Sequence, residues 1–137
     1  MRQIKFRGKC LHCDKWVYGN LVDFGEDEIP EIHGFDLYRE GSLSWREINV
    51  ERSTIGQFTG LLDKNGKEIY EGDIVMFVHT TGRFVGKNIC EVIYDEEFCS
   101  AFSVKLNDTW KIPFSLEFPA KLVEVIGNIH DKEFLKI

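Results

Sequence analysis

An Asn-Gly pair at positions 65 and 66, inside the stretch 57–75 (QFTGLLDKNGKEIYEGDIV), constrains the fold of this chain more than any other feature. Such a pair supplies the two residues of positive φ that a tight β-hairpin turn requires. Apolar residues lie on both sides of the turn: Phe58 and Leu61 before it, Ile69 and Tyr70 after it. Because these side chains can meet across one face, the stretch predicts two short antiparallel strands.

A second break, Gly72-Asp73, comes just before five consecutive apolar residues at 74–78. A short apolar run of this kind is typical of a strand that is covered by protein on both faces. We therefore expect it to be the first strand of a small barrel, followed by a polar loop at 79–87.

The remaining sequence also favours strands over helices. Residues of high β propensity (Val, Ile, Thr, Phe, Tyr and Trp) make up 46 of the 137 positions, whereas Ala occurs only twice. Strand patterns recur about every ten residues, at 4–7, 16–22, 45–50, 90–94, 101–106, 110–118 and 122–129. An acidic, turn-rich segment at 23–30 is expected to be a surface loop. Pro113 cannot donate to a ladder, so its segment should be an edge strand or a crossing loop.

These patterns predict a mainly β fold with two parts and few short helical turns, among them one at 131–135. Residues 1–52 should form an amino-terminal β lobe, and residues 53–137 an SH3-like barrel, or β roll. The order in the second part is the one expected of an SH3-type barrel: a strand, a long loop, a hairpin, an irregular edge and a closing strand.

The charge of the chain argues against a general affinity for nucleic acid, because the net charge is −6. A local exception lies at the amino terminus, where the basic residues are Arg2, Lys5, Arg7 and Lys9, with Lys15 beyond them. One interpretation is a solvated edge strand whose charges discourage aggregation. The other is an edge that contacts phosphates, with Trp16 or Tyr18 available for stacking.

Cys10 and Cys13 have the spacing of half a zinc site, with His12 between them. A complete site would need Cys90 and Cys99, or His12 together with His33, to converge in space. The alternative is that these cysteines are ordinary small residues of a turn and a core. No nucleophile, acid–base pair or phosphate-binding loop is evident, so neither catalytic residues nor a cofactor is expected.

The amino terminus, MRQIKFRGK, lacks the apolar core of a signal peptide, and no uncharged apolar run is long enough to cross a bilayer. We therefore expect a cytoplasmic protein with reduced cysteines and no membrane partner.

Four segments resemble the YopX-like family of phage and prophage proteins: 4–8 with 16–20, 54–61, 63–75 and 125–129. The resemblance implies a predominantly β protein with an SH3-like carboxy-terminal barrel, acting in the cytosol of a bacterial host. It implies no activity, and it assigns no catalytic residue.

Three classes of function follow as hypotheses. The favoured one is a non-catalytic binding or assembly module, which forms a homo-oligomer or binds another phage or host protein. It rests on large apolar residues beyond the needs of one core: Trp45, Trp110, Phe114 and Phe118. The alternative is a nucleic-acid-binding accessory protein that uses the basic amino-terminal strand. A hydrolase or metal-dependent enzyme is the third class, and it is not expected.

Overall fold

The computed structural model describes residues 3–97 and 100–131. The chain is mainly β and divides into two compact units, Met1–Phe58 (unit 1) and Thr59–Ile137 (unit 2). The boundary at residue 52 remains a prediction. Arg2, Cys99 and all but the first residue of the expected helical turn at 131–135 lie outside the described residues.

The strands of the described chain pair antiparallel, as the sequence patterns predicted. Unit 1 holds β1 (Phe6–Lys9), β2 (Trp16–Val22), β3 (Glu31–Phe35), β4 (Trp45–Asn49) and the start of β5 (Gly56–Leu62). Unit 2 holds the end of β5, then β6 (Glu68–Tyr70), β7 (Asp73–His79), β8 (Gly86–Asp95), β9 (Ala101–Lys105), β10 (Lys111–Pro113) and β11 (Glu124–Asn128). The short helical turns are 3-10 turns, η1 (Arg52–Thr54) and η2 (Ala120–Leu122). No described helix has the length and apolar character needed to traverse a bilayer.

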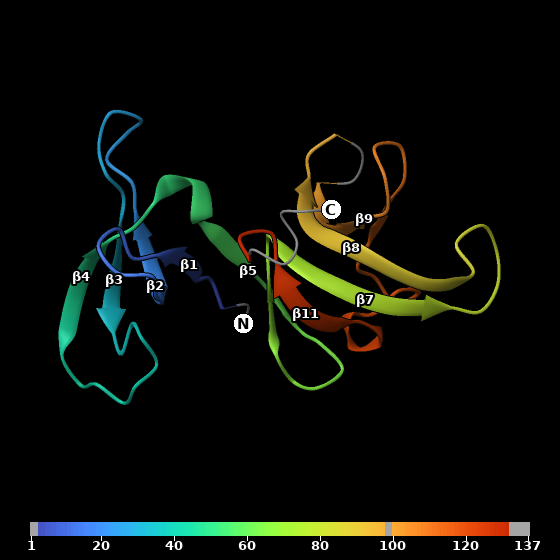
Figure 1. The fold of residues 1–137 in the computed structure, drawn as a ribbon, viewed down its shortest axis with the longest axis horizontal. Helices are drawn as coiled ribbons and strands as arrows, with labels where there is room; N and C mark the ends of the chain where they lie inside the picture. The colour runs from blue at the N-terminus through green and yellow to red at the C-terminus, as the bar shows by residue number, and fades with distance from the viewer. Residues whose placement is uncertain (1–2, 98–99, 132–137) are drawn as a thin grey trace. The chain divides into compact units, whose positions relative to one another are not determined.

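In unit 1, strands β1 to β4 lie next to one another in sequence order (Figure 1). The sheet curls until its ends meet, because Cys10 forms a bridge with Val50 and the Glu51 N–H donates to the Lys9 carbonyl at 2.9 Å. The inner face holds a small core of Val17, Ile32, Leu37 and Val50, each at most 1% exposed. The opposite, outer face therefore carries the side chains at 31, 33 and 35 of β3, next to their partners at 45, 47 and 49 of β4.

The predicted hairpin is confirmed, with β5 and β6 on either side of the turn. The prediction that both residues of the Asn-Gly pair have positive φ is wrong, because among the two only Gly66 does; its N–H donates to the Asp63 carbonyl at 3.0 Å. Gly66 has φ +79°, and nothing lies within 4 Å of the position its Cβ would take, so glycine is favoured there by backbone conformation alone. Asp63 is buried beneath the turn. Its carboxylate accepts hydrogen bonds from the N–H groups of Asn65 (2.8 Å), Lys67 (2.8 Å) and, 62 positions along the chain, Val125 (2.9 Å).

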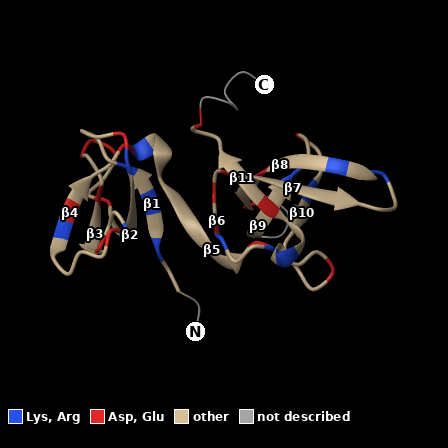
Figure 2. Cartoon of the chain, turned by 60° about the horizontal axis from the view of Figure 1, so that its bottom comes forward, with Lys and Arg blue, Asp and Glu red and all other residues tan. Residues whose placement is uncertain are grey.

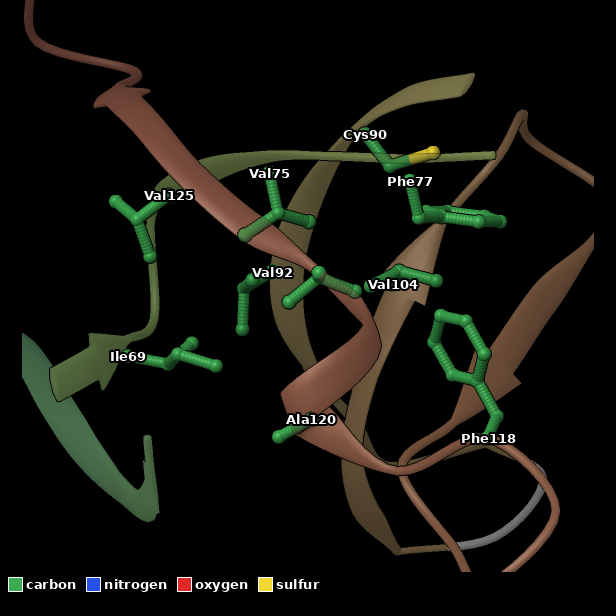
Figure 3. Close-up of a cluster of buried hydrophobic side chains, with 10 residues drawn as sticks. Ile69, Val75, Phe77, Cys90, Val92, Val104, Phe118, Ala120 and Val125 are labelled. Atoms are coloured by element: carbon green, nitrogen blue, oxygen red, sulfur yellow. The ribbon is translucent and has the colours of Figure 1, made fainter. Parts of the chain in front are cut away.

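Unit 2 contains a five-stranded sheet in the order β10-β9-β8-β7-β11. Its core is drawn in Figure 3: Val75, Phe77, Cys90, Val92, Val104 and Val125 come from the sheet, whereas Ile69, Phe118 and Ala120 pack against them from other segments. A 3-10 turn, η2, comes just before the last strand. The SH3-like arrangement of these strands remains a prediction, and so does complete closure of the barrel.

Part of β7 and β8 extends beyond this sheet as a two-stranded arm, residues 77–90 (Figure 1). β11 pairs with β7 only at 73–76, and β9 pairs with β8 only at 91–95. The prediction that 74–78 is covered on both faces is therefore wrong at its outer end, where Val78 is 66% exposed. The loop at the tip is also shorter than expected, because β8 begins at Gly86.

Strand β3 was not predicted. Its sequence, EIHGF, has only two large apolar residues, Ile32 and Phe35, and these do not follow the period of two that is typical of a strand. The predicted edge position of Pro113 is confirmed, because β10 is the last strand of its sheet.

Candidate interaction surfaces

The arm of unit 2 exposes apolar side chains on the face that does not contact the core. Val78 is 66%, Val85 63% and Ile89 52% exposed. No Asp or Glu occurs from residue 74 to residue 90, whereas His79, Arg83 and Lys87 do. Figure 2 shows the resulting blue segments on β8 and in the loop beside it. The arm is therefore an apolar surface with a positive border.

An aromatic and cationic cluster lies next to the tip of the arm. The Arg83 guanidinium is 4.8 Å from the ring centroid of Trp110, and the Phe84 ring meets the same indole edge to face at 6.1 Å. Trp110 remains 44% exposed, so part of its ring is open to a ligand. Such a cluster can stack on a flat group or pair with an acidic one.

An apolar hollow of about 190 Å³ lies elsewhere in unit 2, lined by Leu61, Phe114, Ser115, Pro119 and Ala120. Phe114 stacks on Phe118 at 5.7 Å with an angle of 7° between the rings. Phe118 itself belongs to the core and is 6% exposed, so the prediction that it is surplus to the core is wrong.

The acidic segment 23–31 of unit 1 is held in place by Arg52. The guanidinium donates to both carboxylate oxygens of Asp23, at 2.7 and 3.0 Å, and to the carbonyl oxygens of Gly25 and Glu28. The hydrogen bonds from Arg52 lower the pKa of Asp23 to about 2. Between these anchors the loop presents Glu26 and Asp27 to solvent. Phe24 and Ile29, which are 59% and 52% exposed, lie on the same loop.

The basic amino-terminal strand is largely engaged by aromatic rings of unit 1. Arg7 is only 7% exposed, and its guanidinium lies 4.7 Å from the Trp16 ring centroid. The Lys9 ammonium lies 5.6 Å from the same ring and 3.4 Å from the Asp14 carboxylate. Lys5 lies over Phe58 at 4.9 Å. The charges of these residues therefore already have neighbours in the fold.

The cysteine loop borders a hollow of about 310 Å³, lined by residues 9–14 and Glu51. Burial raises the pKa of the Cys10 thiol. Hydrogen bonds from the Cys13 side chain and the backbone of His12 outweigh that effect, so the pKa lies below its usual value. The Cys13 sulfur is also 3.9 Å from the Tyr38 hydroxyl. This environment makes the Cys10 thiol more acidic than that of a free cysteine.

A complete metal site at the cysteine loop is not assembled within the described residues. There, no third His, Cys, Asp or Glu donor gathers with Cys10 and Cys13 at the spacing of metal ligands. His33, which the sequence offered as a partner, instead groups with Glu31 and Glu47 on the outer face of the sheet. Metal binding by Cys10 and Cys13 stays a prediction.

Sequence reasoning missed the arm as a surface, although a signal was present. Met76 and Val78 alternate with Val75 and Phe77, so only one of the two sets can face the core. The absence of carboxylates from 74 to 90 was a second signal.

Comparison with known proteins gives a family and a fold. A crystal structure of protein EF1440 from Enterococcus faecalis is similar over 98% of this chain and 99% of that chain, with 22% identity and a TM-score of 0.54. At that identity the likeness concerns the fold alone. No match was found among curated proteins. The family model for the YopX protein matches residues 5–135, nearly the full length. The chain therefore belongs to the YopX protein family.

Proposed function

We propose that this protein is a non-catalytic binding and assembly module, and that its arm docks on a second copy of the chain. The observation that supports the proposal is the apolar outer face of the arm. Val78 and Ile89 are both more than half exposed on that face, so a partner that packs on it would bury them.

Charge complementarity favours a second copy as the partner. The arm carries Arg83 and Lys87 and no carboxylate, whereas the segment held by Arg52 carries Glu26 and Asp27. Each surface also includes exposed apolar residues, Val85 on the arm and Phe24 on the acidic segment. Docking of the arm of one copy on the acidic segment of the next would be a head-to-tail contact, which produces rings or filaments.

The mass of the purified protein in solution tests this proposal. We expect oligomers by light scattering at low salt, with a smaller mass at high salt, because the contact is partly electrostatic. The double variant Arg83→Glu, Lys87→Glu should be monomeric. Lys121→Glu, a matched charge reversal in exposed η2, should assemble like the wild type.

A charge swap makes the test specific for the two surfaces. The variant Glu26→Lys, Asp27→Lys should also be monomeric alone, and a mixture of the two reversed variants should regain assembly. A wild type that stays monomeric at low salt, or an arm variant that assembles normally, would reject the proposal.

A second candidate function is binding of single-stranded nucleic acid, and the contact of Arg83 with the exposed ring of Trp110 favours it. Stacking and salt-sensitive attraction would then both arise at the arm rather than at the amino-terminal strand. An oligonucleotide should quench Trp110 fluorescence, and Trp110→Phe should retain binding without that signal. Arg83→Glu should abolish binding, whereas Arg7→Glu should abolish it only if the amino-terminal strand is the site. If the oligonucleotide causes neither quenching nor a mobility shift at low salt, nucleic-acid binding at the arm and at the amino-terminal strand is excluded.

The resemblance also predicts a phage or prophage origin and the cytoplasm of a bacterial host as the site of action. Both remain predictions. They agree with a module whose interactions are with protein chains rather than with a membrane.

A further inference from the structure

We infer that Glu31, His33 and Glu47 form a binding site for a divalent transition-metal ion on the outer face of unit 1. Each residue offers one ligand atom, and these atoms all lie within 4.8 Å of one another. The inference is independent of the arm and of the proposed assembly.

The site is built on two adjacent strands rather than on a loop. His33 of β3 is directly opposite Glu47 of β4, and Glu31 is two residues before His33 on the same face. Asn49 lies opposite Glu31, so a further side chain with an oxygen atom borders the group. Ladder hydrogen bonds hold the backbone of both strands, so little conformational freedom is lost when an ion binds.

The balance of charge favours a cation. The Nε2 atom of His33 is 2.8 Å from Oε1 of Glu31, and the Glu47 carboxylate is within reach of both. In the described part of the chain, no Lys or Arg forms an ion pair with Glu31 or Glu47. A single imidazole cannot neutralise two carboxylates, whereas a divalent ion would.

Two aromatic rings form a wall along one side of the site. Trp45 meets the His33 ring edge to face at 6.3 Å, and Phe35 meets Trp45 in the same way at 5.2 Å. The Trp45 ring therefore contacts the imidazole directly, whereas Phe35 supports Trp45.

The donors define the class of ion. One nitrogen and two carboxylate oxygens suit Zn²⁺, Co²⁺ or Mn²⁺, whereas Mg²⁺ and Ca²⁺ prefer oxygen alone. Metal–ligand bonds of about 2.1 Å place tetrahedral ligands about 3.4 Å apart. A small rotation of the exposed Glu47 side chain would therefore bring the three ligand atoms to the distances that an ion requires. Water would complete the coordination.

Titration of the full chain with Zn²⁺ and with Co²⁺ tests the inference. We expect one saturable site by calorimetry and a change in the fluorescence of Trp45, which lies beside His33. Glu47→Gln and His33→Gln should each weaken binding by more than about tenfold. Glu40→Gln, which removes an exposed carboxylate of the same unit, should leave binding unchanged.

The cobalt spectrum separates this site from the cysteine loop. Ligation by nitrogen and oxygen gives no sulfur-to-metal charge-transfer absorption, whereas ligation by Cys10 or Cys13 would give it. The inference is overturned by a charge-transfer band at one equivalent of metal, by wild-type affinity in Glu47→Gln, or by absence of saturable binding. Because Glu47 is exposed, that variant should fold even if His33→Gln does not.

Discussion

Two hairpins of unit 2 differ in how they are held. The β5–β6 hairpin closes over a buried carboxylate, that of Asp63, which receives three backbone N–H groups. In the arm, the Asn88 side-chain amide donates hydrogen bonds to the carbonyl oxygens of Phe84 and Gly86 near the tip. The first hairpin is thus part of the scaffold, and the second presents a surface. The stretch that carries the family resemblance coincides with the scaffold.

The largest effect on stability is expected from removal of the carboxylate beneath the first hairpin. Asp63→Ala leaves three backbone N–H groups without their acceptor, and the one at Val125 is buried, so we expect a loss of about 2–3 kcal/mol in the free energy of unfolding. Urea unfolding followed by tryptophan fluorescence measures it. Asp108→Ala, which removes a fully exposed carboxylate, is the control and should cost less than about 0.5 kcal/mol. Equal losses in the two variants would show that the first hairpin is not a scaffold.

Low pH should also remove the stabilisation that the Asp63 carboxylate provides. Burial raises the pKa of Asp63, but hydrogen bonds from Val125, Lys67 and Asn65 outweigh it, so the pKa in the folded state lies below 3.8. The carboxylate therefore stabilises the fold fully above its unfolded pKa, and this contribution is lost as the pH falls through the folded value. The difference in stability between wild type and Asp63→Asn should be constant near neutral pH and narrow below about pH 4. A difference that does not depend on pH would contradict this.

A glycine substitution in each hairpin compares their rigidity. Gly66 has φ +79° and Gly82 has φ +86°, and the space for a Cβ is open at both. Alanine should cost about 1–2 kcal/mol at position 66, where the turn is fixed. The cost at position 82 should be smaller, because the tip of the arm can adopt another conformation. Thermal melts of the two variants measure the difference, and a larger cost at Gly82 would reverse the comparison.

The smallest effect on stability is expected on the outer face of the arm. Val78→Thr and Ile89→Thr should each change the free energy of unfolding by less than about 0.5 kcal/mol, because both side chains are already more than half exposed. The same variants should weaken self-association. A large loss of stability with unchanged mass in solution would mean that the arm is packed within its own chain.

The sequence was sufficient for elements that depend on local chemistry. The β5–β6 turn, the edge position of Pro113 and the strand at 101–106, which is β9, each have a local cause, and each was found in the expected place. Strand β3 was missed, because Glu31 and His33 show no apolar period. The outer face of β3 becomes recognisable only beside its partner residues on β4. The register between the two strands cannot be read from the sequence of one strand.

The candidate sites also divide into features that the local sequence reveals and features that depend on the fold. The spacing of Cys10 and Cys13 and the basic residues of the amino-terminal strand could be read from the sequence. The burial of Arg7 could not, because it depends on the fold around it. Glu31 and Glu47 are sixteen positions apart, and only the register of β3 with β4 brings them together. The arm is exposed because β9 and β11 stop short of it, which depends on the lengths of other strands.

The hydrogen bond from Val125 to Asp63 has a consequence for biosynthesis. The donor is synthesised 62 residues after the acceptor, so unit 2 cannot complete this contact until β11 has left the ribosome. A stop codon anywhere before the final strand should therefore yield a chain that is cleared by proteases instead of a shortened but stable product.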